Sequence, residues 1–464
     1  MLASLKFQEQ HREASYRNLK LLKKEGVKIM KKNLKKMAAF GLCAAMGTTM
    51  LAGCGGSDSG DGGSDGGSSG GSGKKTELAF GIWDENQRPA MEKLVEAYEK
   101  ENEDVSIEIQ LTPYKGGEYW TKLEAAAGGG KAPDVFWLNV LHLDSYVDGG
   151  ILADLTEAID ASDINDSFPE TLVENYVRDG VNYAVPKDFD TNALWYNKEI
   201  FDAAGVEYPT DDMTYEDLVK TAEDLKAAGL DDGVYPFACP VDFQTWYYQT
   251  VYANGGYILN DDKTETGYDD PKTQEGIQCW IDMIEKELSP GSAALSETSA
   301  DAMFEGGQLA MNFAGSYMVP QYAGNDAIAD KIDCVEIPTF NGVEDNCING
   351  LGYAVFEGSK NKEAAIDFAI WLGSADAMKI QGETGVVISA RTDAQGYFAD
   401  ANPDYNLAAY TNHSDKAYPL PVCMVAAELY DLEATYLQKA YNGEESLADA
   451  CKELKAEADA LLAK

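Results

Sequence analysis

The sequence from Lys74 to the C-terminus predicts an α/β fold, and two observations carry that prediction. Segments that alternate apolar and polar residues, as strands do, take turns with segments whose apolar residues recur every three or four positions, as in helices. Roughly 390 residues follow Lys74, and a chain of that length can form two domains with separate cores. Alternating element types are typical of a parallel sheet with helices on both faces.

The first unit is expected to run strand, helix, strand, helix, strand. The strands are predicted at residues 77–83, 105–111 and 134–138, and the helices at 91–98 and 119–127. Ligands of parallel sheets bind at the carboxyl ends of the strands, so the residues that leave those ends are expected to face a ligand. They are Trp83-Asp84-Glu85, Thr112-Pro113-Tyr114 and Asn139-Val140-Leu141-His142.

A second α/β unit is expected from residue 181 onward. Residues 183–198 form two extended runs around a polar loop, and a short helix then ends at Gly205. Thr214 is expected to cap a helix that runs to Ala228, with Asp217 where a capping box prefers Glu. Further strands are predicted near 235–239 and 309–314, and further helices at 274–287 and 298–304.

The residues before Lys74 predict export from the cytoplasm. A basic run at 31–36 precedes an uncharged apolar stretch at 37–53, which has the layout of a signal peptide and is too short to span a membrane in the mature protein. Signal peptides begin with their charged run. We therefore expect translation to start at Met30, with residues 1–29 a wrongly assigned upstream extension of the 1–53 signal segment.

The small residues of Leu51-Ala52-Gly53, placed just before Cys54, resemble the lipobox of bacterial lipoproteins. Cys54 would then be lipidated and become the mature N-terminus, held at the outer face of the cell membrane, since two or more acyl chains anchor a protein stably. The alternative is an ordinary secretory signal with a chance cysteine. Residues 54–75 are mostly Gly, Ser and Asp and predict a flexible tether.

The mature chain is strongly acidic. Of 37 Lys and Arg residues 11 precede Cys54, as do 3 of 79 Asp and Glu residues, so 26 basic and 76 acidic residues remain and the net charge is near −50. Nucleic-acid binding depends on neutralising phosphates, so this balance argues against such a partner, and weakly against a strongly anionic ligand. A solvated surface that aids solubility accounts for most of the charge equally well.

Cysteine and histidine usage gives no support for a metal centre, a cofactor or a thiol-redox motif. None of the six cysteines after Cys54 forms a C-x-x-C pair, and only His142 and His413 remain as imidazoles. Export permits disulfides, and a bond between Cys334 and Cys347 is one option, with buried free thiols as the alternative. The remaining cysteines, expected to be buried thiols, are Cys239, Cys279, Cys423 and Cys451.

A series of short segments is similar, in order and spacing, to the extracellular solute-binding proteins of ABC sugar importers, the group that includes maltose-binding protein. The resemblance covers nearly everything from Thr76 to the C-terminus. No single segment is decisive, but their succession is specific. The segments are Ala132-Pro133-Asp134-Val135-Phe136, Leu152-Ala153-Asp154-Leu155-Thr156, residues 183–198 and 304–311, Gly350-Leu351-Gly352-Tyr353-Ala354-Val355, and residues 362–368.

This resemblance implies a type II periplasmic-binding-protein fold, in which two α/β lobes are joined by a hinge and trap ligand in the cleft between them. The first lobe would comprise residues 76–189 and 349–385, and the second lobe residues 190–348 and 386–464. The first crossing would fall at 188–191. Helices at 422–441 and 446–462 would pack on the second lobe.

Sugar chemistry indicates which residues to expect in the cleft. Sugars present flat C–H faces and a rim of hydroxyls, so aromatic rings and planar polar groups suit them. The mature chain carries 25 Tyr and 7 Trp. Any one ring is as often part of a core as of a site, and we expect Trp120, Trp137, Trp195 and Trp371 in the core. The candidate rings are Trp83, Tyr114, Trp246, Tyr247, Tyr317 and Tyr353, and the candidate polar partners are Asp84, Glu85, Asn139, Asp188, Asp190, Ser316, Asn349 and Arg391.

Two more specific interpretations, a calcium-binding loop and a glycosidase, have less support from the sequence. Asp188, Asp190 and Asn192 echo a calcium loop, but Ala193 stands where that loop needs Gly. A glycosidase needs two carboxylates flanking a bond, and nothing in the sequence marks such a pair. We therefore expect a lipid-anchored, monomeric, non-catalytic receptor that passes a neutral sugar or oligosaccharide to a membrane permease. The alternatives are a secreted glycan-degrading enzyme and a receptor for a polyol phosphate or other small solute.

Overall fold

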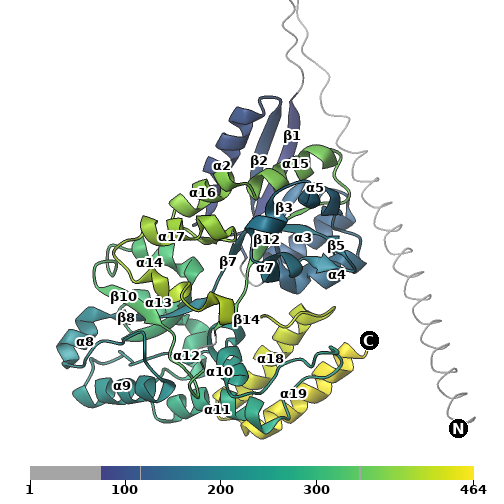
Figure 1. The fold of residues 1–464 in the computed structure, drawn as a ribbon. Coiled ribbons are helices and arrows are strands. Elements are labelled where there is room, and N and C mark those ends of the chain that lie inside the picture. Colours follow the sequence, from purple (N-terminus) through teal and green to yellow (C-terminus); the bar gives the residue numbers. More distant parts are fainter. Residues whose placement is uncertain (1–74, 115–116, 344–345) are drawn as a thin grey trace, which may run out of the picture. The chain divides into compact units, whose positions relative to one another are not determined.

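The computed structural model describes residues 75–114, 117–343 and 346–464. Cys54, the signal segment and nearly all of the tether lie outside these residues. The described chain is built on two sheets that have separate sets of covering helices (Figure 1). In the described ranges, no helix is both long enough and apolar enough to cross a membrane.

The first sheet has the order β2-β1-β3-β12-β6. The parallel part confirms the predicted first unit: β1 (Thr76–Ile82) lies between β2 (Val105–Leu111) and β3 (Val135–Asn139). β12 (Leu351–Val355) returns from far along the sequence and pairs antiparallel with both β3 and β6 (Ala184–Pro186). Its helices are α2 (Arg88–Glu101), α3 (Glu118–Gly128), α15 (Lys362–Leu372) and α16 (Ala375–Glu383).

The second sheet is antiparallel throughout, with β8 (Asn192–Asn197) between β10 (Ile332–Glu336) and β9 (Met311–Gly315). The expected strand at 235–239 is absent from it, because Pro236 and Pro240 lack backbone donors and only a single bridge, between Tyr235 and Leu309, forms there. The helices of this part are α8 (Lys198–Ala204), α9 (Tyr215–Ala228), α10 (Tyr248–Ala253), α11 (Pro271–Glu285), α12 (Ser292–Glu297), α13 (Ala300–Glu305) and α14 (Val319–Ala323).

Local signals placed several helix ends correctly. Thr214 caps α9, and the reciprocal hydrogen bonds of a capping box form with Asp217. At the C-terminus α18 (Ala426–Tyr441) and α19 (Leu447–Leu462) run side by side (Figure 1). Smaller helices are α4 (Leu143–Asp148), α5 (Thr156–Asp160), α6 (Ile164–Ser167), α7 (Glu170–Glu174) and α17 (Gly396–Ala401).

Short strands join the two sheets. β7 (Asp188–Phe189) pairs with β13 (Ile388–Ser389), and a bridge links Asp190 to Asn349. After β13 the chain forms α17, which packs on α16, and it reaches the second sheet only at residues 407–410. Two further strand pairs are β4 (Val177–Arg178) with β5 (Val181–Asn182), and β11 (Cys347–Ile348) with β14 (Tyr418–Pro419).

Of the two alternatives for Cys334 and Cys347, a disulfide or buried free thiols, the disulfide is not formed. Both thiols are free and buried, as are those of Cys239, Cys423 and Cys451, while Cys279 is free and half-buried. Cys334 lies on β10, where its Sγ contacts the carbonyl oxygen of Asn406 at 3.3 Å, and Cys347 lies on β11.

Candidate functional site

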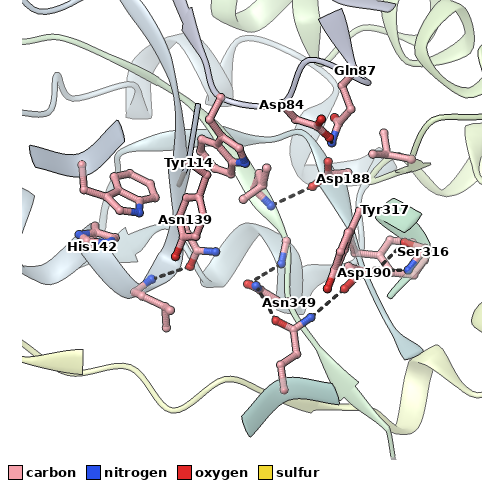
Figure 2. Close-up of a pocket in the computed structure, with 18 residues that line it drawn as sticks. Asp84, Gln87, Tyr114, Asn139, His142, Asp188, Asp190, Ser316, Tyr317 and Asn349 are labelled. Carbon is pink, nitrogen blue, oxygen red and sulfur yellow. Dashed lines mark hydrogen bonds between the residues drawn. The ribbon is translucent and has the colours of Figure 1, made fainter. Parts of the chain in front are cut away.

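A pocket of about 340 Å³ opens where the carboxyl ends of the first-sheet strands meet the connecting strands (Figure 2). Most of the residues in its walls come from three sources: the ends of β1, β2 and β3, the two crossing segments around Asp188 and Asn349, and residues that follow β9 or precede α10. This placement follows the rule that ligands of such sheets bind beyond the carboxyl ends of the strands.

Aromatic rings form one wall of the pocket. The ring centre of Trp83 lies 6.2 Å from that of Tyr114 and 5.4 Å from that of Trp120. His142 stacks on Trp120 at 3.9 Å. Tyr317, which is 43% exposed, stands on the other side of the pocket, where Figure 2 shows it beside Asp190 and Ser316. Rings thus face the pocket from both of its sides.

Acidic and amide groups form a second, polar wall. Gln87 donates from Nε2 to Oδ2 of Asp84 over 3.0 Å, and the Asp84 Oδ1 accepts from the backbone N of Asn86 over 2.8 Å. Asp188 accepts at Oδ1 from the backbone N of Leu351 over 2.9 Å, and its Oδ2 pairs with Lys187 from behind the wall. These carboxylates keep lone pairs that can accept hydrogen bonds from the hydroxyl groups of a ligand.

A closed ring of hydrogen bonds forms the floor at the crossing segments. Gln244 donates from Nε2 to Oδ2 of Asp190 over 2.7 Å and accepts at Oε1 from Nδ2 of Asn349 over 3.0 Å. Asp190 and Asn349 are also joined backbone to backbone, at 2.7 Å and 3.0 Å. Ser316 donates to Oδ1 of Asp190 from its backbone N over 2.5 Å and from Oγ over 2.6 Å.

Asp190 and His142 are two of the pocket groups whose pKa values are shifted. Burial raises the pKa of Asp190 to about 7, against the opposing effect of the hydrogen bonds from Ser316. Burial lowers the pKa of His142 to about 4, so its imidazole is neutral at physiological pH and offers one donor and one acceptor. In the described ranges, no group of three or more His, Cys, Asp or Glu side chains is arranged to hold a metal ion.

The structure brings most of the candidate residues together. Those that line the pocket are Trp83, Asp84, Tyr114, Asn139, Asp188, Asp190, Ser316, Tyr317 and Asn349. Glu85 does not line it. This residue is exposed in the turn before α2, where its carbonyl oxygen accepts from the backbone N of Arg88 at 3.2 Å.

Four further candidates lie away from the pocket. Trp246 is buried, with Nε1 donating to the carbonyl oxygen of Ala238 over 2.9 Å, because it occupies the inner face of a π-helix at 243–247. Tyr247, in the same turn, points to Glu433. Tyr353 is buried on β12 and donates to Gln381 over 2.8 Å.

Arg391 is the fourth candidate outside the pocket. Its guanidinium pairs with both oxygens of Asp163, at 3.0 Å and 2.7 Å, and with Asp393 at 2.9 Å. These partners raise the pKa of Arg391 and lower that of Asp163, with the hydrogen bonds between the two as the largest cause. The bidentate pair fastens the segment after β13 to the start of α6, and Arg391 is not among the residues that line the pocket.

Several lining residues were not among the candidates. Trp120 was expected in the core, and it is buried, yet one of its edges reaches the pocket. His142 belongs to the segment after the predicted strand at 134–138, which is expected to face a ligand, so its position already carried a signal. Gln244 had none, because it follows no predicted strand. The others are Gln87, Leu141, Phe189, Gly350, Leu351 and Val387.

Residues 83–379 match the profile of a protein family described as bacterial extracellular solute-binding protein. A galactooligosaccharide-binding protein of Bacillus subtilis is 26% identical over 370 residues, which cover 76% of this chain and 80% of the relative. A diacetylchitobiose-binding protein of Streptomyces coelicolor is 27% identical over 351 residues, covering 72% of this chain and 76% of the relative.

A solved structure is also similar over nearly its whole length. An ABC substrate-binding protein from Listeria monocytogenes, determined in complex with cycloalternan, aligns with a TM-score of 0.77 at 27% identity. The alignment covers 84% of this chain and 99% of that one.

Proposed function

Because this chain belongs to the bacterial extracellular solute-binding proteins, we propose that it captures a neutral sugar or oligosaccharide outside the cell and delivers it to the permease of an ABC importer. Its likeness to solved substrate-binding proteins confirms the two-lobed α/β fold expected from the sequence. Proteins of this group bind their solutes and are not enzymes, so the chain is a receptor.

The observation that carries the proposal is the pairing of aromatic rings with acceptors in one pocket. Tyr114 on one side, with the ring of Trp83 next to it, and Tyr317 on the other offer flat surfaces to the C–H faces of a sugar ring. The polar wall and floor offer the carboxylate and amide oxygens that hydroxyl groups need. A purely apolar ligand would cover the remaining acceptor positions of these groups without supplying a donor, which disfavours such a ligand.

Charge favours a neutral ligand over a phosphorylated one. Three aspartates line the pocket, and no lysine or arginine is among its described lining residues. A phosphate group is normally bound by basic side chains or by the N-terminus of a helix. A receptor for a polyol phosphate is therefore the weaker alternative.

The carboxylates are also arranged for binding more than for hydrolysis. Asp188 pairs with Lys187, and Asp190 accepts three hydrogen bonds from Ser316 and Gln244. A glycosidase needs one carboxyl group free to protonate the leaving oxygen. Chromatography of an oligosaccharide before and after incubation should show it unchanged.

Known ligands of similar proteins suggest which sugars to try first. The relatives are named for galactooligosaccharide and diacetylchitobiose, and the Listeria structure contains cycloalternan. We propose an oligosaccharide of this general class, with the cleft between the proposed lobes, residues 76–189 with 349–385 and residues 190–348 with 386–464, closing upon it. Small-angle scattering would then report a smaller radius of gyration with the sugar bound.

The location is proposed on sequence grounds. Lipidation of Cys54 behind a cleaved signal, followed by the 54–75 tether, would hold the receptor as a monomer at the outer face of the membrane near its permease. The family's extracellular description agrees with a position outside the cytoplasm.

The test is a thermal-shift screen of cycloalternan, galactotriose and diacetylchitobiose, followed by calorimetry. A ligand present at about 100 times its dissociation constant adds roughly 2.7 kcal/mol of stability. Glucose 6-phosphate serves as the anionic comparison. Among variants, Tyr317→Ala removes a pocket ring, and Tyr208→Ala is its matched control, because Tyr208 is an exposed tyrosine that does not line the pocket. If only glucose 6-phosphate raises the melting temperature, the neutral-sugar proposal fails.

A further inference from the structure

Lys187 lies directly behind the polar wall of the pocket with its side chain fully buried. It is the single residue between β6 and β7, where the chain leaves the first sheet. Its backbone N donates to the carbonyl oxygen of Leu351 over 2.7 Å, and its own carbonyl accepts from Nε2 of Gln381 over 2.9 Å. Anchors on β12 and α16 therefore fix the point from which the side chain extends.

The ammonium group contacts two residues that line the pocket. Its Nζ donates to Oε1 of Gln87 over 2.8 Å and pairs with Oδ2 of Asp188. It also lies 4.4 Å from the centre of the Trp137 ring, whose π face attracts a cation. A buried ammonium is costly unless it is paired and hydrogen-bonded, and these contacts provide that compensation.

Hydrogen bonds carry the influence of Lys187 into the pocket. Gln87 is only 4% exposed, and while its Oε1 faces Lys187 its Nε2 donates to Oδ2 of Asp84. Both ends of this amide are engaged, so it cannot turn over without losing a bond at each end. Asp188 is held in the same way, by Lys187 at one oxygen and by Leu351 at the other.

We propose that Lys187 is a positioning residue of the ligand site. It does not line the pocket, but it orients Gln87 and Asp188, and through Gln87 also Asp84, so that their oxygen atoms stand in fixed places for ligand hydroxyls. It also offsets the charge of one of the three lining aspartates, which lets the pocket offer carboxylate acceptors with less net charge. This inference rests on the proposed function.

The alternative role for such a residue is purely structural: it would neutralise Asp188 so that the fold is stable, with no effect on binding. The two roles differ when the charge of Asp188 is removed. In an Asp188→Asn background nothing remains for Lys187 to neutralise, but Gln87 still depends on its ammonium. The effect of Lys187→Met in that background therefore reports the loss of the bond to Gln87 without the loss of a counter-charge for Asp188.

The experiment compares Asp188→Asn with the double variant Lys187→Met/Asp188→Asn, alongside wild type and Lys187→Met. Calorimetry uses whichever of cycloalternan, galactotriose or diacetylchitobiose binds wild type. We expect the double variant to bind about 10- to 100-fold more weakly than Asp188→Asn, the usual effect of losing a hydrogen bond to a charged group. Equal affinities of these two variants would overturn the proposal.

A second measurement needs no sugar. In protein labelled with 15N-glutamine, the NMR signal of the Gln87 side-chain amide can be assigned by its loss in Gln87→Leu. We expect this signal to report an ordered amide in wild type and in Asp188→Asn, and a disordered amide in the double variant. An unchanged signal would contradict positioning. If none of the three sugars binds wild type, the sugar proposal fails on these probes, while the amide signal still decides the role of Lys187.

Discussion

Gln244 donates a hydrogen bond from Nε2 to Oδ2 of Asp190 over 2.7 Å, and in doing so it ties the first crossing segment to the turn before α10. Its Oε1 accepts from Asn349, so the second crossing segment is tied to the same side chain. Two of the segments that connect the two sheets therefore meet at one amide in the floor of the pocket. A ligand that contacts this floor would therefore act on both of these connecting segments at once.

Replacing this amide should weaken both the fold and the site. Gln244→Leu keeps most of the volume but leaves Oδ2 of Asp190 and Nδ2 of Asn349 without their partner. We expect a loss of about 1 to 3 kcal/mol in unfolding free energy, measured in urea, together with weaker sugar binding. Gln278→Leu is the control, because Gln278 makes an exposed bond within α11. Equal effects of the two substitutions would contradict a special role for Gln244.

The aromatic residues Tyr317 and Trp246 should respond in opposite ways to alanine substitution. Tyr317 is exposed in the pocket, so Tyr317→Ala should weaken sugar binding by roughly 2 to 4 kcal/mol and leave the melting temperature nearly unchanged. Trp246 is buried, so Trp246→Ala should lower stability by about 3 to 5 kcal/mol while the folded fraction binds normally. Calorimetry and thermal melting of both variants check this prediction. Reduced sugar affinity of folded Trp246→Ala would contradict it and indicate that Trp246 belongs to the binding site.

Stability should fall as the pH rises from 6.5 to 8. Burial raises the pKa values of Asp190 and Glu433 to about 7, so the folded protein releases protons in this interval, whereas the unfolded chain has already released them. The stabilisation is therefore complete at acid pH and is lost as the pH passes 7. The expected loss is on the order of 1 kcal/mol per group, measured by urea denaturation at each pH.

Glu433→Gln provides the control for this pH dependence. Glu433 is buried and accepts hydrogen bonds from Tyr247, Tyr248 and Tyr268, and tyrosine hydroxyls can donate to the oxygen of an amide and accept from its nitrogen. The variant should lose part of the slope between pH 6.5 and 8. His142 acts weakly in the opposite direction, because its pKa is lowered on folding and the unfolded chain still binds part of a proton at pH 6.5. This contribution is the same in wild type and in Glu433→Gln, so it cancels in the comparison. If the unfolding free energy of the variant fell with pH as steeply as that of wild type, Glu433 would not contribute to this pH dependence.

Lipid anchoring can be tested at Cys54. Cys54→Ser removes the only thiol that a lipobox could use, so the protein should move from the membrane to detergent-free fractions with its sugar affinity unchanged. Fractionation followed by immunoblotting measures the shift. Unchanged membrane association of the variant would count against lipidation.

Much of the fold and part of the site could be predicted from sequence because the signals are local. The predicted strand at 105–111 matches β2 residue for residue, and the cap at Thr214 lies where the helix begins. Residues such as Asp84, Tyr114 and Asn139 were predicted by the rule about strand ends, because each lies just beyond or at the carboxyl end of a strand. Asp188, Asp190 and Asn349 were inferred from the family resemblance, which places the crossing segments.

Only the tertiary structure decided which rings and amides face the pocket. Trp120 and Trp246 both lie on helical turns, yet one reaches the pocket and the other is enclosed, because a ring's exposure depends on what other segments pack around it. Gln244 and Lys187 gain their places from partners far away in sequence, such as Asn349 and Gln87. Sequence periodicity reports which side of an element is buried, whereas long-range packing determines what that side meets.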